Sequence, residues 1–173
     1  SDQGRVLKEG IHTVIVGKPN VGKSSLLNVL VGSQRAIVTD VAGTTRDVLE
    51  EQINLHGIQL NIIDTAGIRN TDDIVEKIGV DRAKQYLEDA DLVLYVIDGS
   101  RTLSEEDQEI VNMIQGKKVI ALINKSDLEQ QAEWKQLEFI TNHVIAISAK
   151  NGDGIEELTD RIRELFLQGE VSF

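Results

Sequence analysis

The chain has 173 residues, of which 40% are hydrophobic, and this length and composition suit one compact domain with a single core. Its 29 acidic residues against 18 Lys and Arg give a formal charge of −11, which disfavours a surface that grips nucleic acid. The sequence has no cysteine, no recognisable signal peptide or lipidation motif, and no apolar run that predicts a membrane span. We therefore expect a cytoplasmic protein.

A loop typical of phosphate binding lies near the start of the chain. Ile11 to Val16 is a short β-branched run that predicts a buried strand, and residues 17–24 (GKPNVGKS) fit the pattern G-x-x-x-x-G-K-[ST]. Apolar residues then recur at helical spacing, namely Leu26, Leu27, Leu30 and Val31. In such a loop the backbone N–H groups surround phosphate oxygens, Lys23 reaches the β and γ phosphates, and the Ser24 hydroxyl binds Mg²⁺. The alternative is a glycine-rich turn that merely joins strand to helix.

A hairpin is expected next. Val48 to Leu55 and Ile58 to Ile63 read as strands joined by His56-Gly57, which would place one antiparallel strand at the edge of the sheet. Asp64-Thr65-Ala66-Gly67 follows the second strand, where open α/β sheets bind their ligands. Asp64 is suited to hold Mg²⁺ through water, although a plain strand-end turn is the alternative.

Two further motifs also follow apolar strands. Asn124-Lys125-Ser126-Asp127 comes after Val119 to Ile123, and Ser148-Ala149-Lys150 comes at the end of Val144 to Ile147. The Asp127 carboxylate can accept hydrogen bonds from the N1–H and N2–H₂ groups of guanine, whereas adenine has a bare N1 that would be repelled. Backbone N–H groups of the last motif can contact the guanine O6. These motifs predict GTP rather than ATP.

Strands alternate with helical stretches, which predicts a mostly parallel sheet. Helices are expected over Ile74 to Leu87, Ser104 to Ile114, Gln130 to Ile140 and Gly154 to Leu167. In their order, the motifs resemble those of the P-loop GTPases over Ile11 to about Leu167. The resemblance implies a three-layer α/β fold of the P-loop NTPase (Ras-like) type, with a mostly parallel six-stranded sheet and one antiparallel edge strand.

Within that class the segment Gly43-Thr44-Thr45-Arg46-Asp47 supplies a switch threonine, Thr45, whose hydroxyl would complete Mg²⁺ coordination. Ile68 stands where Ras-like GTPases carry a water-orienting glutamine. Another group must then orient the water, and another cation must neutralise charge between the phosphates. Arg46 and Arg69 are candidates or merely solvated arginines. Asn20 can help to bind a monovalent cation or can simply shape the loop.

Residues 17–25, 39–47, 64–69 and 75–83 together resemble the G domains of the tRNA-modification GTPases of the MnmE (TrmE) family. The resemblance implies that K⁺ replaces an arginine finger, bound through Asn20 and switch groups at Thr39, Val41 and Thr44. It also implies that Glu76 orients the attacking water, although a carboxylate there also suits a helix start. Residues 11–168 would form the G domain, 1–10 a flanking segment or cloning remnant, and 169–173 a tail.

Several partners follow from the same resemblance. The family's G domains dimerise when GTP and K⁺ are bound, and the parent protein works with a flavoprotein, MnmG (GidA), on the wobble uridine of certain tRNAs. Contact with tRNA would belong to other domains of the parent protein. Lys23, Thr45 and Glu76 are then the expected catalytic groups. The residues expected to contact GTP or GDP and its ions are Asn20, Val21, Gly22, Lys23, Ser24, Ser25, Thr39, Asp40, Val41, Ala42, Gly43, Thr44, Thr45, Asp64, Thr65, Ala66, Gly67, Asn124, Lys125, Asp127, Ser148, Ala149 and Lys150.

Two other interpretations stay open. The motifs Gly-Thr-Thr-Arg-Asp and Asp-Thr-Ala-Gly-Ile-Arg also resemble a G domain of the Der (EngA) ribosome-assembly proteins, which act as binding switches. In that family we expect basic residues after Arg69, whereas this chain has Asn70-Thr71-Asp72-Asp73. A guanine-nucleotide binding module without turnover is the third interpretation.

Overall fold

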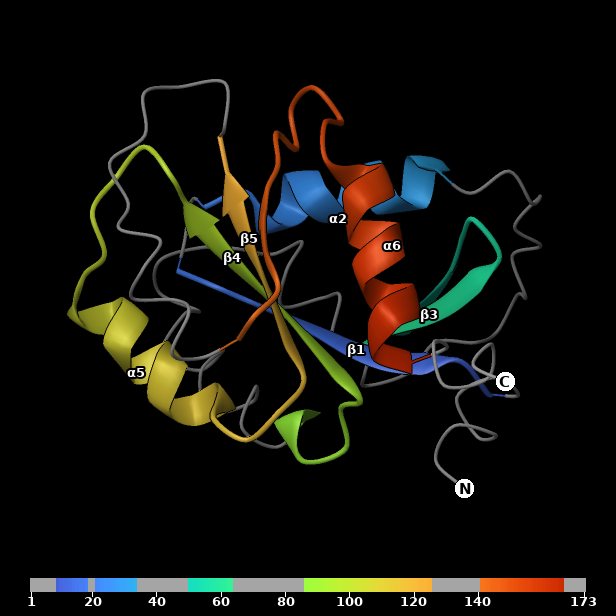
Figure 1. Ribbon diagram of the computed structural model, residues 1–173, viewed down its shortest axis with the longest axis horizontal. Coiled ribbons are helices and arrows are strands. Elements are labelled where there is room, and N and C mark those ends of the chain that lie inside the picture. Colours follow the sequence, from blue (N-terminus) through green and yellow to red (C-terminus); the bar gives the residue numbers. More distant parts are fainter. Residues whose placement is uncertain (1–8, 19–20, 34–49, 64–85, 126–140, 167–173) are drawn as a thin grey trace.

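A computed structural model describes residues 9–18, 21–33, 50–63, 86–125 and 141–166. In this part of the chain, six strands form one sheet in the order β2-β3-β1-β4-β5-β6 (Figure 1). The strands are β1 (Ile11–Val16), β2 (Glu50–Leu55), β3 (Ile58–Ile63), β4 (Leu92–Asp98), β5 (Val119–Asn124) and β6 (Val144–Ala146). The longer helices of the described residues are α2 (Lys23–Ser33), α5 (Glu105–Ile114) and α6 (Ile155–Phe166).

The sheet is parallel except at one edge. Strands β2 and β3 pair antiparallel, from Glu50 opposite Ile63 to Leu55 opposite Ile58, and β2 lies at the end of the sheet. Both turn residues, His56 and Gly57, have positive φ (52° and 91°), which matches the right-handed twist of a tight hairpin. The hairpin and the antiparallel edge strand are therefore confirmed. The predicted start at Val48 lies outside the described residues.

Strand β4 occupies the middle of the sheet, paired in parallel with β1 on one side and β5 on the other. All seven of its residues are buried. Its side chains alternate between two apolar cores: Leu94 and Val96 belong to one, and Tyr95 and Ile97 to the other. A strand that packs on both faces has a continuous apolar run rather than an alternating pattern, as expected for the centre of a parallel sheet.

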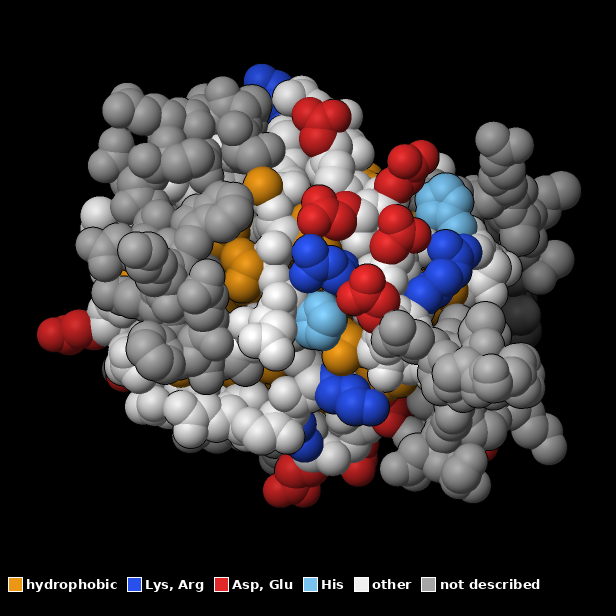
Figure 2. Space-filling view, in the orientation of Figure 1, with side chains coloured by type: hydrophobic (Ala, Val, Ile, Leu, Met, Phe, Trp, Pro, Cys, Tyr) orange, Lys and Arg blue, Asp and Glu red, His pale blue; other side chains and the backbone are white. Residues whose placement is uncertain are grey.

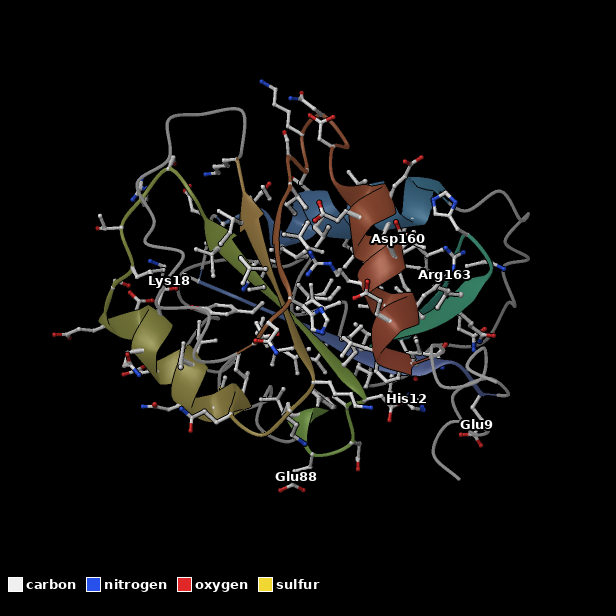
Figure 3. The ribbon with its side chains drawn as sticks, viewed as in Figure 1. Glu9, His12, Lys18, Glu88, Asp160 and Arg163 are labelled. Atoms are coloured by element: carbon white, nitrogen blue, oxygen red, sulfur yellow. The ribbon has the colours of Figure 1, made fainter. Side chains whose placement is uncertain are left out.

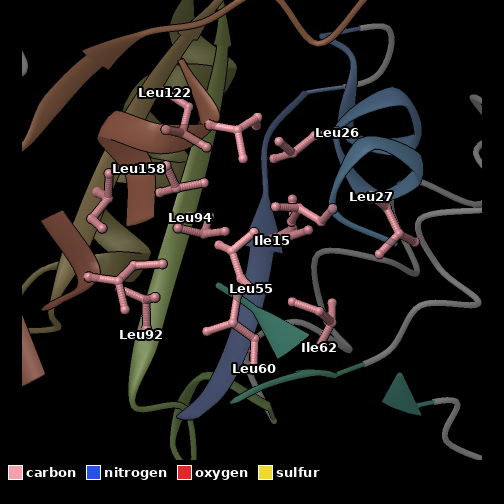
Figure 4. Close-up of a cluster of buried hydrophobic side chains, with 14 of the residues drawn as sticks. Ile15, Leu26, Leu27, Leu55, Leu60, Ile62, Leu92, Leu94, Leu122 and Leu158 are labelled. Carbon is pink, nitrogen blue, oxygen red and sulfur yellow. The ribbon is translucent and has the colours of Figure 1, made fainter. Parts of the chain in front are cut away.

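Helices cover both faces, so the described part of the chain has three layers (Figure 1). Buried residues of α2 and α6, among them Leu26, Leu27 and Leu158, pack on one face (Figure 4). On the opposite face, Ile110 and Ile114 of α5 pack against the sheet. The predicted three-layer α/β fold is confirmed.

The helix boundaries agree closely with the sequence expectations. Helix α5 starts one residue after its N-cap Ser104, and α6 starts one residue after Gly154 and runs to Phe166. Strand β6 ends at Ala146, one residue before the predicted Ile147, although the Ile147 N–H still donates to the Ile123 carbonyl at 2.8 Å. The expected helices over 74–87 and 130–140 lie outside the described residues, apart from 86 and 87.

Candidate functional site

Polar groups gather at the carboxyl ends of the parallel strands. Strand β1 runs directly into Gly17, β4 ends at Asp98 and β5 ends at Asn124. The last two residues are register partners in adjacent strands. Because ligands of open α/β sheets bind beyond the carboxyl ends of the strands, this edge is the candidate site.

The loop between β1 and α2 packs closely against the sheet. A Cβ atom on Gly17 would lie 2.6 Å from the Val96 carbonyl oxygen, and one on Gly22 would overlap the Asn124 side-chain amide. Gly22 also has φ of +104°, which other residues rarely adopt. The first helical bond runs from the Leu26 N–H to the Gly22 carbonyl at 2.9 Å, so the first turn of α2 faces the loop. Such a glycine-lined helix N-terminus fits a phosphate group.

Asn124 joins this loop to two other parts of the site. Its Nδ2 donates to the Val21 carbonyl at 2.7 Å, and its Oδ1 accepts from the Ala149 N–H at 2.9 Å. The residue is only 3% exposed. One buried amide therefore fixes the position of the loop between β1 and α2 relative to residues 148–150. These two segments are more than a hundred residues apart in the sequence.

Lys125 has a positive φ of 64°, and its ammonium contacts Asp98 Oδ2 at 2.9 Å. Burial raises the pKa of the Asp98 carboxyl, but hydrogen bonds from Ser100 and Lys125 outweigh it and hold the pKa below its ordinary value. Asp98 Oδ1 accepts from the Ser100 N–H at 2.9 Å and from its hydroxyl at 2.5 Å. An ionised carboxylate thus orients the Lys125 side chain at the end of the sheet.

The segment that contains Ser148 and Ala149 folds into a tight turn. The Ser148 carbonyl accepts from the N–H groups of Asn151, Gly152 and Asp153 at 2.7–3.1 Å. Ser148 and Ala149 are 1% and 2% exposed, whereas Lys150 is exposed. The turn sets the direction of the backbone that, by the sequence argument, faces a guanine base.

Lys18 joins the other half of the loop to α5. Its Nζ lies 2.8 Å from Asp107 Oδ2 and donates to Ser104 Oγ at 3.0 Å, and Figure 3 shows the side chain directed towards the start of α5. Asp107, 3% exposed, also accepts from the Tyr95 hydroxyl at 2.8 Å and from the Ser104 N–H at 2.9 Å. Burial, together with the charge of Asp107 and the hydrogen bond to it, raises the pKa of Tyr95 well above its ordinary value, so the phenol stays protonated.

The structure brings together part of the predicted site. The residues placed around the carboxyl edge are Val21, Gly22, Lys23, Ser24, Ser25, Asn124, Lys125, Ser148, Ala149 and Lys150. The remaining predicted residues lie outside the described residues: Asn20, Thr39, Asp40, Val41, Ala42, Gly43, Thr44, Thr45, Asp64, Thr65, Ala66, Gly67, Glu76 and Asp127, as do the candidate cations Arg46 and Arg69.

Sequence reasoning missed β4 and two carboxylates, Asp98 at the end of that strand and Asp107 on α5. Six apolar residues precede Asp98 and Gly99, which repeats the strand-then-aspartate pattern of Ile63 and Asp64. Asp107 follows Ser104 by three positions, the spacing of a capping box, and the structure has that box. Both signals were therefore present in the sequence.

The outer surface carries charges of both signs side by side. On the face drawn in Figure 2, basic side chains lie next to acidic ones over the strands and α6. Arg161 lies 3.5 Å from Glu157, and Arg163 lies 3.6 Å from Asp160. Among the described residues, none of the helices combines the length and apolar character that crossing a membrane requires.

The fold and the glycine-lined loop, with Asn-Lys and Ser-Ala-Lys segments beside it, define a P-loop GTPase domain. Residues 12–125 match the family described as 50S ribosome-binding GTPase, and the chain belongs to this family. It is therefore a GTP-hydrolysing domain that binds guanine nucleotides.

Curated relatives resemble the chain over its whole length. A tRNA modification GTPase MnmE from Clostridioides difficile is 54% identical over 99% of this chain, and one from Lachnoclostridium phytofermentans is 51% identical over 100%. The chain spans 38% of the length of each of these relatives.

Solved structures agree on the fold. An Era variant from Aquifex aeolicus bound to GDP and AlF₄⁻ is 35% identical, with a TM-score of 0.67 over 91% of this chain and 57% of that one. The G domain of the FeoB iron transporter of T. maritima is 29% identical, with a TM-score of 0.61 over 90% of this chain and 98% of that one.

Proposed function

We propose that this chain is the G domain of a tRNA-modification GTPase that acts on the wobble uridine, with residues 11–168 as the domain proper. The observation that carries the proposal is the 51–54% identity to MnmE proteins, which extends over 99–100% of the chain. Because the chain spans only 38% of those relatives, the tRNA chemistry would belong to other parts of the parent protein. The G domain would supply a conformational cycle driven by GTP.

The nucleotide site follows from the residues at the carboxyl edge of the sheet. The backbone N–H groups of Gly22 to Ser25 would hold the phosphates, and Lys23 would contact the β and γ oxygens. The Ser24 hydroxyl, at the start of α2, fits the oxygen-rich coordination of Mg²⁺, with Thr45 and water on Asp64 as the other ligands. Asp127 would read the guanine edge, and Ala149 and Lys150 would approach the guanine O6.

Hydrolysis would depend on K⁺, because Ile68 occupies the place of the usual glutamine. In the proposed arrangement, Asn20, Thr39, Val41 and Thr44 provide oxygen ligands for K⁺, which supplies the positive charge of an arginine finger. Glu76 orients the attacking water. A loop closes around such an ion only when the ion is bound, so K⁺, GTP and pairing of two G domains would be coupled.

The proposed partners are a second copy of the G domain in the GTP-bound state and, through the full-length protein, the flavoprotein MnmG. We propose a cytoplasmic location, where tRNA is modified. The formal charge of −11 supports the proposal that other domains of the parent protein bind the tRNA.

The test compares GTP turnover in KCl and in NaCl at equal ionic strength. We expect turnover at least about tenfold faster in KCl, since charge neutralisation at the transferred phosphate commonly contributes that much or more. Asn20→Ala should abolish this difference. Asn112→Ala, an exposed asparagine on α5, is the matched control and should keep it.

Equal turnover in both salts, with Asn20→Ala unchanged, would contradict the K⁺ model. Sedimentation with GDP, AlF₄⁻ and KCl tests pairing of the G domains, and we expect a dimer that reverts to monomer in NaCl. The wobble-uridine role requires a strain in which the full-length gene is deleted. Loss of the modification there, restored by the intact gene but not by one carrying Lys23→Ala, is the expected outcome.

A second candidate is a ribosome-assembly switch. The family description refers to 50S ribosome binding, and a further structural neighbour with 35% identity and a TM-score of 0.65 is Era in complex with 16S ribosomal RNA. Co-sedimentation of the full-length protein with ribosomal subunits in a GTP-dependent manner would favour this candidate. The acidic charge argues against RNA contact by the G domain itself.

A further inference from the structure

The phosphate loop is braced at two places by different chemistry. Its second half is held by Asn124, through the Val21 carbonyl. Its first half is held by Lys18, through the buried carboxylate of Asp107 on α5. Asp107 and Asn124 share no hydrogen bond among the described contacts, so the two braces can be broken separately.

The contact between Lys18 and Asp107 is linked to Lys23 through the peptide group between Gly17 and Lys18. Lys18 follows Gly17 in sequence, so holding its side chain also holds the peptide group between the two residues. The Gly17 carbonyl in turn accepts from Lys23 Nζ at 2.6 Å. The sheet leaves little space beside Gly17, because a Cβ there would lie 2.6 Å from the Val96 carbonyl oxygen.

We infer that the Lys18–Asp107 pair is a positioning device for Lys23, which it acts on through the Gly17 carbonyl. The inference rests on the proposed role of Lys23 as the group that contacts the β and γ phosphates. The pair holds the ammonium where the terminal phosphate needs it, and it leaves guanine recognition to Asn124 and the loops that Asn124 joins.

The environment of Asp107 supports a positional role. The Asp107 side chain is 4% exposed and that of Lys18 is 17% exposed, so the pair is largely shielded from water. The oxygen of Asp107 that contacts Lys18, Oδ2, also accepts from the Ser104 N–H at 2.9 Å. A carboxylate oxygen held by both an ammonium and a backbone N–H has little freedom to move, and small displacements of a phosphate-binding group are costly for catalysis.

The experiment uses Lys18→Met, which keeps most of the side-chain length and removes the charge. Three quantities are measured: the affinity for GDP, the affinity for a non-hydrolysable GTP analogue, and single-turnover GTP hydrolysis. We expect hydrolysis to fall about tenfold and the dissociation constant of the analogue to rise about tenfold, while that of GDP stays within about threefold. Lys18→Arg, which keeps the charge, should restore most of the loss.

Tyr95→Phe is the matched control, because it removes a hydrogen bond to the same carboxylate without touching the loop. It should lower the melting temperature and leave both affinities and the hydrolysis rate within about twofold of the unsubstituted protein. Asp107→Asn gives a second break of the pair in case Lys18→Met does not fold, since asparagine can still accept from the Ser104 N–H.

Equal weakening of GDP and analogue binding would overturn the inference, as would unchanged values in both Lys18→Met and Asp107→Asn. The same selective loss in Tyr95→Phe would also overturn it, because the effect would then reflect the core and not the loop. Identical turnover in KCl and NaCl by the unsubstituted protein would contradict only the K⁺ proposal, since the affinity measurements do not depend on K⁺.

Discussion

The two braces of the phosphate loop differ in the chemistry that they use. On the side proposed to bind guanine, a neutral amide, Asn124, donates to the Val21 carbonyl and accepts from the Ala149 N–H. On the phosphate side Lys18 and Asp107 form a shielded ion pair. A neutral amide that uses both of its ends has no chemically equivalent replacement, because no other side chain as short as asparagine has its donor and its acceptor on two separate atoms. An ion pair tolerates exchange of one cation for another.

The difference indicates how the site divides its tasks. The amide sets the distance between the two loops that would enclose the base in the proposed site, and it does so independently of pH and salt. The ion pair places a positive charge beside a loop that receives a polyanion, where charge and position both matter. The following predictions test this division, from the largest expected effect to the smallest.

Asn124→Ala should have the largest effect. It leaves the Val21 carbonyl and the Ala149 N–H without their partner in a buried site, which costs about 3 kcal/mol of the free energy of unfolding. GTP binding should also be lost, because the two loops are no longer joined. Urea denaturation and GTP titration measure the two effects. The control is again Asn112→Ala, which should stay within about 0.5 kcal/mol; a stability loss in Asn124→Ala no larger than in the control would contradict the prediction.

Gly22→Ala tests the contact between the loop and Asn124. The new methyl group adds two costs, the unfavourable backbone at φ of +104° and overlap with the Asn124 amide, so we expect about 2–3 kcal/mol of destabilisation. Gly116→Ala is the matched control, because Gly116 has φ of +83° and nothing within 4 Å of a Cβ. It should lose only about 1 kcal/mol, the backbone cost. Equal losses of stability in the two variants would contradict the prediction, because the loop would then have moved to accommodate the methyl group at no extra cost.

Asp98→Asn should have the smallest effect, and one that depends on pH. Because the folded pKa of Asp98 lies below its ordinary value of about 3.9, the ionised group stabilises the fold fully above that value and loses the effect as the pH falls through the folded pKa. The variant should therefore be about 1 kcal/mol less stable than the unsubstituted protein at pH 7, and the gap should close below about pH 4.

Denaturation at several pH values measures this gap. Glu157→Gln is the control, since Glu157 pairs with Arg161 on the exposed surface of α6 at 3.5 Å and should change stability by less than about 0.5 kcal/mol at any pH. A gap for Asp98→Asn that is constant from pH 7 to pH 3 would mean that its ionisation does not support the fold.

Much of the fold could be predicted because the signals are local. The hairpin at His56-Gly57 depends on residues that adopt positive φ, and α5 begins after Ser104 because serine followed by Asp107 caps a helix. The phosphate-binding loop was recognisable because its chemistry needs glycines and a lysine at fixed spacing within one segment. Likewise, apolar runs that end in Asn124 or Ser148 placed those residues at strand ends.

What the sequence could determine by itself was therefore the identity of the segments and the chemistry of their motifs. The tertiary structure decided which segments hold one another: Asn124 bonds to Val21 and Ala149, and Asp107 bonds to Lys18 and Tyr95. Those contacts join residues between 12 and 103 positions apart, and hydrogen bonds leave no periodic mark in the sequence. They arise only when parallel strands bring their carboxyl ends to one edge, because the sheet then places distant side chains within reach of each other.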